Sequence, residues 1–274
     1  MKPTATTTEN GLVVEGLCKR YGDHLAVDDV SFALAPGTCL AIVGESGSGK
    51  TTTVRMLVGL ERPDGGTVRL DGRDRSARAR GRDERLARAR EIQMVFQDPY
   101  LSLDPRVPVA DCVAEVLRLH TRLDPAARAA RVRELLEQVG LGEREAAALP
   151  RRLSGGQRQR VAIARALAVE PRVLVLDEAV AALDVSIQAQ ILDLLATIRR
   201  EAGIAYLFVT HDLAVVRHVA DEVLVLKGGR VVETGSADRV LDSPEHPYTK
   251  LLLGSVPRRG WDASRVASER RPAR

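Results

Sequence analysis

A glycine-rich segment between an apolar run and a helical pattern constrains this chain more than any other feature. Residues 44–51 read Gly-Glu-Ser-Gly-Ser-Gly-Lys-Thr, directly after the apolar run at residues 40–43 and before a helical pattern that extends to Leu60. Glycines at this spacing let successive backbone N–H groups turn inward, and the N-terminus of a following helix adds its dipole. Such a loop attracts phosphate oxygens.

The polar residues of this loop match the chemistry of a nucleoside triphosphate. Lys50 carries a charge that neutralises β- and γ-phosphate oxygens, and the Thr51 hydroxyl is a ligand for Mg²⁺. A chance glycine-rich turn is the alternative, but such a turn does not require a strand before it and a helix after it. The predicted phosphate-binding residues are Gly44, Glu45, Ser46, Gly47, Ser48, Gly49, Lys50, Thr51 and Thr52.

Two acidic residues follow a second apolar run. Residues 173–176 are all apolar, and Asp177 and Glu178 come directly after them. Ligands of parallel α/β sheets gather at the carboxyl ends of the strands. We therefore predict that Asp177 anchors Mg²⁺ and that Glu178 is the general base that deprotonates the attacking water. A solvated acidic strand end is the alternative, which a phosphate loop in the same chain disfavours.

A third motif gives the chain a family resemblance. Residues 153–157 read Leu-Ser-Gly-Gly-Gln and precede an apolar helical stretch. A Ser-Gly-Gly turn at a helix start is either a helix N-cap or an anion site. Beside a phosphate loop, it resembles the signature motif of the ABC family of ATPases. In that family the signature of one subunit closes over the nucleotide held by the other, which implies an ATP-binding role for Ser154, Gly155, Gly156 and Gln157.

Four single residues match further motifs of this family. Tyr21 resembles the aromatic residue that stacks on adenine, and Gln97 resembles the glutamine that contacts Mg²⁺ or water and senses the transmembrane partner. Asp184 resembles the aspartate that communicates across the dimer. His211 resembles the histidine that contacts the γ-phosphate, although an isolated histidine is more often structural. The resemblance implies a catalytic group of Lys50, Gln97, Glu178 and His211 and a Mg²⁺ group of Thr51, Gln97 and Asp177.

The resemblance runs from Leu12 to Leu253 and implies the fold of the family. That fold is an α/β P-loop NTPase core of the RecA type, with an antiparallel β subdomain and a helical subdomain that carries the signature. Helical spacing from Pro105 to about Gly142 agrees with it. We expect a nucleotide-binding domain over residues 11–256 with a helical lobe at about 105–165. Residues 1–10 and the Arg-rich residues 257–274 are expected to be flexible.

Two residues depart from the family pattern. Ala179 stands where the family usually has a proline after the catalytic glutamate, and Ala181 stands where it has a hydroxyl residue. Loss of a rigid proline and of a hydroxyl group loosens the loop that faces the dimer partner. We expect these changes to affect the coupling between subunits more than the chemistry.

Proline-rich segments narrow the resemblance to one subfamily. Two such segments resemble segments of oligopeptide and dipeptide importers: residues 97–100 with 102–106, and Ser-Pro-Glu-His-Pro-Tyr-Thr at residues 243–249. Turns alone are the alternative explanation of such prolines. The resemblance implies a subunit that hydrolyses ATP with Mg²⁺ and drives transmembrane permease subunits, which work with an extracytoplasmic solute-binding protein. Its ATPase partner can be identical or different. The solute can be a peptide or another small solute such as nickel.

Charge and composition limit the other partners. The chain has 41 Lys and Arg against 37 Asp and Glu, a net charge of +4 that does not indicate nucleic acid. Residues 73–90 and the tail are Arg-dense but lack aromatic stacking residues apart from Trp261. We therefore expect a solvated helix at residues 73–90 and no nucleic-acid partner, with anionic lipid as an alternative contact of the tail.

Two rival functions remain open. A non-transport ABC ATPase that acts on nucleic acid or ribosomes usually carries a coiled-coil insertion or a second cassette, and the sequence has one phosphate loop and no sustained heptad pattern. A regulator that binds nucleotide without turnover does not need Glu178 and His211. Since no apolar stretch approaches the roughly 18 residues of a membrane span, we expect a peripheral protein at the cytoplasmic face of the membrane.

Overall fold

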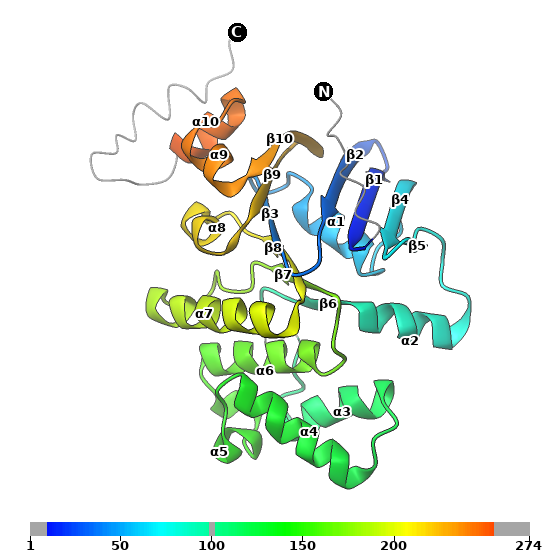
Figure 1. The fold of residues 1–274 in the computed structure, drawn as a ribbon, viewed down its shortest axis with the longest axis vertical. Coiled ribbons are helices and arrows are strands. Elements are labelled where there is room, and N and C mark those ends of the chain that lie inside the picture. The colour runs from blue at the N-terminus through cyan, green and yellow to red at the C-terminus, as the bar shows by residue number, and fades with distance from the viewer. Residues whose placement is uncertain (1–9, 99–101, 255–274) are drawn as a thin grey trace.

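Two β-sheets and a group of helices make up the computed structural model of this protein, which describes residues 10–98 and 102–254 (Figure 1). The termini predicted to be flexible, residues 1–10 and 257–274, lie outside the described residues except for Asn10, as do Pro99 and Tyr100 of the subfamily motif. None of the helices in the described part is both long and apolar enough to cross a bilayer.

The smaller sheet is antiparallel and has the strand order β2-β1-β4-β5. A turn at Gly22-Asp23 joins the first two strands. Buried and exposed side chains alternate along much of their length. The strands are β1 (Leu12–Tyr21), β2 (His24–Leu34), β4 (Gly65–Leu70) and β5 (Arg73–Asp74).

The larger sheet is mostly parallel and has the strand order β10-β9-β3-β8-β7-β6, with only β10 antiparallel to its neighbour. Every residue of β3, β7 and β8 is buried, as expected for strands covered on both faces. The strands are β3 (Cys39–Val43), β6 (Ile92–Val95), β7 (Val173–Asp177), β8 (Ala205–Val209), β9 (Glu222–Lys227) and β10 (Arg230–Ser236).

The two faces of this sheet pack against different elements. Ile42, Val175 and Leu207 point to one face and pack against the antiparallel sheet and helix α1 (Lys50–Leu57). Leu176 and Phe208 point to the opposite face and pack against the helical lobe. Strand alternation therefore joins three layers, with the parallel sheet in the middle. Helices α8 (Leu213–Val219), α9 (Ala237–Asp242) and α10 (Pro247–Gly254) cover the β9 end of the sheet.

The helical lobe extends from Val109 to Leu167. Val113, Leu117, Leu135 and Leu136 form its buried interior, as their helical spacing indicates. Its last helix also packs against β6 and α7 (Val185–Ala202), which attaches the lobe to the sheet. The lobe consists of α3 (Val109–His120), α4 (Pro125–Gln138), α5 (Glu143–Ala146), the 3-10 helix η2 (Pro150–Arg152) and α6 (Gly155–Leu167).

The helix after the glycine-rich loop is shorter than predicted. Helix α1 spans Lys50–Leu57 and does not reach Leu60. Gly59 has a left-handed φ of +78°, and the Leu60 N–H donates to the Arg55 carbonyl oxygen at 2.9 Å. This hydrogen bond and the left-handed glycine form a Schellman motif, which ends the helix.

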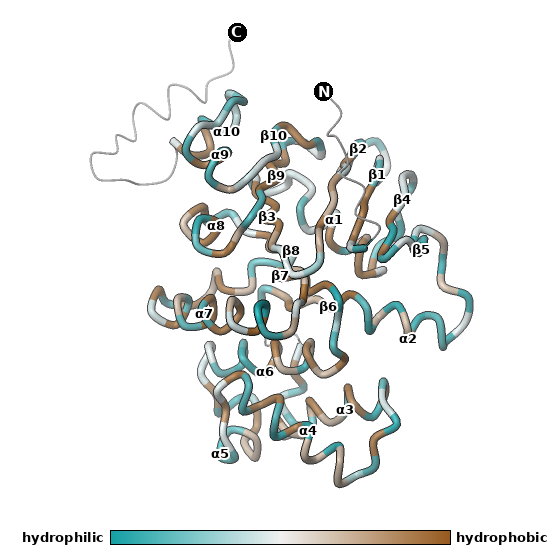
Figure 2. Tube along the Cα trace, viewed as in Figure 1, coloured by the Kyte–Doolittle hydropathy of each residue, from teal (hydrophilic) through white to brown (hydrophobic). Residues whose placement is uncertain are grey.

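The Arg-dense segment also differs from its prediction as one solvated helix. Helix α2 (Gly81–Glu91) is mostly hydrophilic and has no buried residue, but Arg73 and Asp74 before it form β5 (Figure 2). The Arg75 side chain is 7% exposed, pairs with Glu91 and donates to the Arg88 carbonyl oxygen at 2.9 Å. The prediction is therefore correct for α2 and wrong for the residues before it, because a tertiary ion pair buries Arg75.

Candidate nucleotide-binding site

Neighbouring parallel strands bring the predicted functional residues to one edge of the larger sheet. The phosphate loop, residues 44–51, follows β3, and Asp177 ends β7. His211 follows β8, which lies between these two strands, and Gln97 is exposed just after β6, the neighbour of β7. Because these strands are parallel, their carboxyl ends meet at the same edge.

Two glycines of the loop are required by its close packing. Gly44 has a φ of +155°, and a Cβ atom there would lie 2.3 Å from the Leu226 carbonyl oxygen. Gly49 has a φ of +102°, and a Cβ atom there would lie 2.5 Å from the Ala26 carbonyl oxygen. Both contacts are with backbone atoms, which cannot rotate away. The ends of β9 and β2 therefore hold the loop in a conformation that only glycine adopts easily.

Lys50 lies folded into the loop and is largely buried. Its Nζ atom donates to the carbonyl oxygens of Gly44, at 2.8 Å, and Glu45, at 2.9 Å. Burial lowers the pKa of Lys50, although the carboxylates of Glu178 and Asp177 counteract this effect. The ammonium group therefore bonds to the loop and interacts electrostatically with the predicted base Glu178 and the predicted Mg²⁺ anchor Asp177.

Asp177 is buried with one oxygen unsatisfied. Its Oδ1 atom has no hydrogen-bond partner among the described residues. Burial and the neighbouring Glu178 carboxylate raise the pKa of Asp177, while Arg55, Lys50 and the Thr51 hydroxyl act in the opposite direction. A buried carboxylate oxygen without a donor, close to a threonine hydroxyl, matches the oxygen ligands that Mg²⁺ prefers.

Glu178 has an unusual backbone conformation. Its φ is +49°, a left-handed value that is strained in a residue with a side chain. The N–H group of Glu178 donates to the Val209 carbonyl oxygen at 2.9 Å, and the Ala181 N–H donates to the Glu178 carbonyl oxygen at 3.0 Å. These bonds hold the carboxylate where its Oε1 atom lies 3.1 Å from His211 Nδ1. No local sequence pattern indicates this strain.

Tyr21 lies at the tip of the β1–β2 hairpin and is 47% exposed. Lys19 Nζ lies 5.3 Å from the centre of its ring. Burial and the Glu61 carboxylate raise the pKa of the Tyr21 hydroxyl. The Ala26 carbonyl group on the same hairpin packs against Gly49 of the phosphate loop. The exposed Tyr21 ring therefore lies in the same region of the molecule as the loop.

The signature residues form an N-cap at the start of α6, in the helical lobe. The Ser154 hydroxyl accepts from the Gln157 N–H at 3.2 Å, and the Gln157 side chain accepts from the Ser154 N–H at 3.0 Å. A Cβ atom at Gly156 would lie 2.4 Å from Ile187 Cγ2, so α6 packs closely on α7. Asp184 caps α7 and accepts from the Ile187 N–H at 3.0 Å.

One contact with the phosphate loop could not be predicted from the sequence. The Glu45 N–H donates to the hydroxyl of Tyr248, on α10, at 3.0 Å. Tyr248 belongs to the proline-rich segment at residues 243–249, whose sequence indicates the subfamily but not this contact. That segment is the one sequence signal that points to this part of the site.

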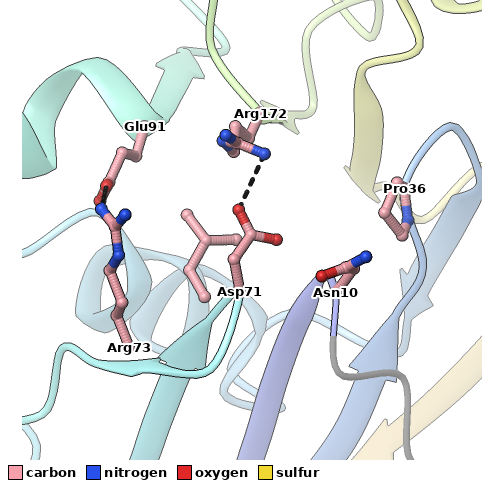
Figure 3. A pocket seen from close by; sticks show the side chains of 7 residues that line it. Asn10, Pro36, Asp71, Arg73, Glu91 and Arg172 are labelled. Carbon is pink, nitrogen blue, oxygen red and sulfur yellow. Dashed lines mark ion pairs between the residues drawn. The ribbon is translucent and has the colours of Figure 1, made fainter.

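A cavity of about 350 Å³ lies at the other edge of the sheet, before the amino ends of β6 and β7 (Figure 3). Ion pairs cross it, at 2.9 Å between Arg172 and Asp71 and at 3.7 Å between Arg73 and Glu91. Because this cavity lies at the amino ends of the strands, it is distinct from the candidate nucleotide site. It is also lined by Asn10, Pro36 and Leu70.

Comparison with known proteins agrees with this geometry. Residues 27–181 match the ABC transporter family, and residues 232–273 match the C-terminal region of the oligopeptide/dipeptide transporter family. The di/tripeptide transport ATP-binding protein DppF of Pseudomonas aeruginosa is 45% identical over 245 residues, which cover 89% of this chain and 75% of DppF.

Two further relatives are longer proteins. The glutathione import ATP-binding protein GsiA of Escherichia coli is 50% identical over 232 residues, 85% of this chain and 37% of GsiA. The oligopeptide transport ATP-binding protein OppD of Mycobacterium tuberculosis is 48% identical over 241 residues, 88% of this chain and 39% of OppD. The chain therefore spans well under half the length of these two relatives.

Solved structures share the fold. A dimeric post-hydrolysis state of the ATP-binding cassette MJ0796, bound to ADP and Pi, superposes with a TM-score of 0.73 and 32% identity, covering 82% of this chain and 98% of that one. CbiO1 from Clostridium perfringens, part of the ABC transporter complex cbiONQ, gives a TM-score of 0.77 and 31% identity over 85% of this chain and 91% of that one. The chain therefore belongs to the ATP-hydrolysing, ATP-binding proteins of the ABC transporter family, within the oligopeptide and dipeptide transporter subfamily.

Proposed function

We propose that this chain uses the edge of its parallel sheet to hydrolyse ATP and so drives the uptake of peptides through a membrane permease. The observation that carries this proposal is the meeting of the phosphate loop, the buried Asp177 and the Glu178–His211 pair at that edge. A nucleotide-binding domain over residues 11–256 holds all of these groups.

The phosphate loop binds the triphosphate of ATP. The N-terminus of α1 and the loop N–H groups other than those of Glu45 and Ser48, which donate to Tyr248 and to the Glu45 carbonyl oxygen, bind the phosphate oxygens. Lys50 exchanges its carbonyl partners for β- and γ-phosphate oxygens. Tyr21 stacks on the adenine ring from the tip of the β1–β2 hairpin. The residues assigned to the triphosphate are Gly44, Glu45, Ser46, Gly47, Ser48, Gly49, Lys50, Thr51 and Thr52.

Asp177, Thr51 and Gln97 are the residues that would hold Mg²⁺. The unsatisfied Oδ1 atom of the buried Asp177 supports this assignment. Bound Mg²⁺ supplies positive charge that stabilises the negative charge of the transferring phosphoryl group. Burial and Glu178 raise the pKa of Asp177 against the opposing effect of Arg55 and Lys50, and the positive charge of bound Mg²⁺ would favour its ionised form.

Glu178 takes the proton of the attacking water. Its carboxylate is positioned by a strained backbone and by His211, whose Nδ1 atom lies 3.1 Å away. The same histidine reaches toward the γ-phosphate, so one side chain connects the base to the phosphoryl group that the water attacks. The bond that breaks joins the γ-phosphorus to the bridging oxygen, and the bond that forms joins it to the water oxygen.

A second ATPase subunit completes the site. Ser154, Gly155, Gly156 and Gln157 of one subunit cover the nucleotide held by the other, and Asp184 passes the state of one site to its partner. The exposed positions of Ser154 and Asp184 support these roles. Binding of two ATP molecules closes the dimer, and hydrolysis releases it. Ala179 and Ala181 make the loop between Glu178 and Asp184 less rigid, which weakens this communication.

The similarity to DppF and the match to the oligopeptide/dipeptide C-terminal region support a peptide as the transported solute. The partners are then transmembrane permease subunits and an extracytoplasmic solute-binding protein, with this chain at the cytoplasmic face. Purification of the tagged chain from its source membrane, followed by ATPase assays in liposomes, tests this proposal.

We expect co-purified permease subunits and an ATPase rate that rises when the solute-binding protein is loaded with a di- or tripeptide. Glutathione and nickel are the comparison solutes in the same assay. A chain that purifies only with nucleic acid or ribosomes, or a rate that responds to nickel and to no peptide, contradicts the proposal.

A further inference from the structure

A tyrosine from the end of the described chain contacts the phosphate loop. Tyr248 lies in α10, is 4% exposed and packs within the apolar cluster formed by α8, α9, α10 and the sheet. Its hydroxyl accepts a hydrogen bond from the Glu45 N–H, 203 positions earlier in the sequence, at 3.0 Å. A residue far from the loop in sequence therefore bonds to its backbone.

This hydrogen bond acts on the same peptide group that holds Lys50. The Glu45 N–H and the Gly44 carbonyl belong to one planar peptide unit. The carbonyl oxygen accepts from Lys50 Nζ at 2.8 Å, while the N–H donates to Tyr248. Two hydrogen bonds on opposite sides of one peptide strengthen each other and fix its orientation. Loss of either bond frees that peptide to rotate.

The proline-rich segment around Tyr248 is itself held in place. Glu233 on β10 is 8% exposed and accepts from the N–H groups of Glu245, at 2.8 Å, and His246, at 3.1 Å. The Nδ1 atom of His246 in turn accepts from the Tyr248 N–H at 3.1 Å. Lys227 Nζ lies 4.8 Å from the centre of the Tyr248 ring. These contacts fix the start of α10 and so fix where the hydroxyl lies.

We infer that Tyr248 is a positioning residue for the phosphate loop, which sets the Gly44–Glu45 peptide and through it the starting position of Lys50. The inference rests on the proposed role of Lys50 in binding ATP. Without the hydroxyl, the loop spends less time in the conformation that accepts phosphates, and the apparent affinity for Mg-ATP falls with that fraction. Tyr248 does not touch the reacting atoms, so turnover at saturation stays close to its normal value.

Tyr248→Phe distinguishes the effect of the hydroxyl from that of the ring, because phenylalanine keeps the ring in the apolar cluster and lacks only the hydroxyl. We expect the KM for Mg-ATP to rise roughly 5- to 20-fold, the usual consequence of leaving a buried donor without its acceptor, with kcat within about two-fold of normal. Glu233→Gln weakens the support of the segment and should raise KM in the same direction by less.

Tyr206→Phe is the matched control. Tyr206 is also buried, at 3% exposure, and its hydroxyl donates to the Leu195 carbonyl oxygen at 3.0 Å, away from the phosphate loop. The substitution removes the same atom and a hydrogen bond of the same length. It should lower the midpoint of thermal unfolding without changing KM.

Steady-state ATPase kinetics of the assembled transporter and calorimetric titration of the purified chain with Mg-ATP give the two readouts. A KM and a dissociation constant of Tyr248→Phe equal to those of the unmodified chain, or to those of Tyr206→Phe, overturn the inference. An unmodified chain that binds Mg-ATP without hydrolysing it contradicts the proposed function instead, and the calorimetric comparison still decides the role of Tyr248.

Discussion

Because α6 packs closely on α7 at Gly156, we predict that a larger residue at this position destabilises the protein. A Cβ atom at this position would lie 2.4 Å from Ile187 Cγ2, whereas carbon atoms in contact are ordinarily about 3.5–4.0 Å apart. Ile187 is β-branched, so its χ1 is stiff, and its N–H is bonded to the Asp184 cap at 3.0 Å. Gly156→Ala must therefore move the start of one helix relative to the other.

The free energy of unfolding should fall by about 1–2 kcal/mol. Inserting a methyl group into a packed contact costs about 1–3 kcal/mol, and the better helix propensity of alanine offsets up to about 1 kcal/mol of that. For a chain of this size, such a loss corresponds to a fall of roughly 2–8 °C in the unfolding midpoint. Urea unfolding measures it as a lower midpoint concentration at unchanged slope.

The adjacent glycine supplies the control. A Cβ atom at Gly155 would lie 3.5 Å from Leu183 Cδ2, which is an ordinary contact, so Gly155→Ala should change stability by less than about 0.5 kcal/mol. In an Ile187→Ala background the clash is absent, and Gly156→Ala should then lose most of its effect. If Gly156→Ala is as stable as Gly155→Ala, or equally harmful in both backgrounds, the packing argument is refuted.

Three further predictions concern charged groups. Asp177→Asn should raise the unfolding midpoint of the nucleotide-free protein, because it removes a buried carboxylate with an unsatisfied oxygen and a raised pKa. In the same melting experiment it should abolish the extra stabilisation by Mg-ATP, and a lower nucleotide-free midpoint contradicts this prediction. Glu91→Gln should destabilise the protein by about 1–3 kcal/mol in urea unfolding, because Arg75 loses its carboxylate partner, while Arg82→Gln on the exposed face of α2 should have little effect. Burial alone would raise the pKa of Glu233, but the N–H groups of Glu245 and His246 outweigh it and lower that pKa below its ordinary value of 4.5. The carboxylate therefore stabilises the fold above pH 4.5, and this contribution is lost as the pH falls further. Glu233→Gln should be less stable than the unmodified chain at pH 7, and a stability difference that does not narrow below pH 4.5 argues against this origin.

The parts of the site that could be predicted from the sequence are those that depend on neighbouring residues. The phosphate loop and the acidic pair could be placed because each follows a short apolar run, and such runs become the buried parallel strands β3 and β7. Gly59, which ends α1 at Leu57, is also part of the local sequence, but a single glycine within a helical pattern does not by itself determine where the helix ends. These features depend on residues a few positions apart.

The remaining features depend on contacts that no local pattern specifies. Arg75 is buried by its ion pair with Glu91 across a loop, so its segment resembled a solvated helix. Glu178 combines a left-handed φ with a hydrogen bond to Val209 of β8, 31 positions later in the sequence. The segment around Tyr248 was recognised as a motif, but its hydrogen bond to Glu45 spans 203 positions. Only the folded structure brings these groups together.

Glu178→Gln gives the most direct measurement of the central claim that this edge of the sheet hydrolyses ATP. The substitution keeps the size of the side chain and removes the base beside His211. We expect ATP turnover to fall by about 10²–10⁴-fold, while Mg-ATP still binds and an ATP-bound dimer accumulates on size-exclusion chromatography. Turnover that survives unchanged contradicts the account, because another group must then deprotonate the water.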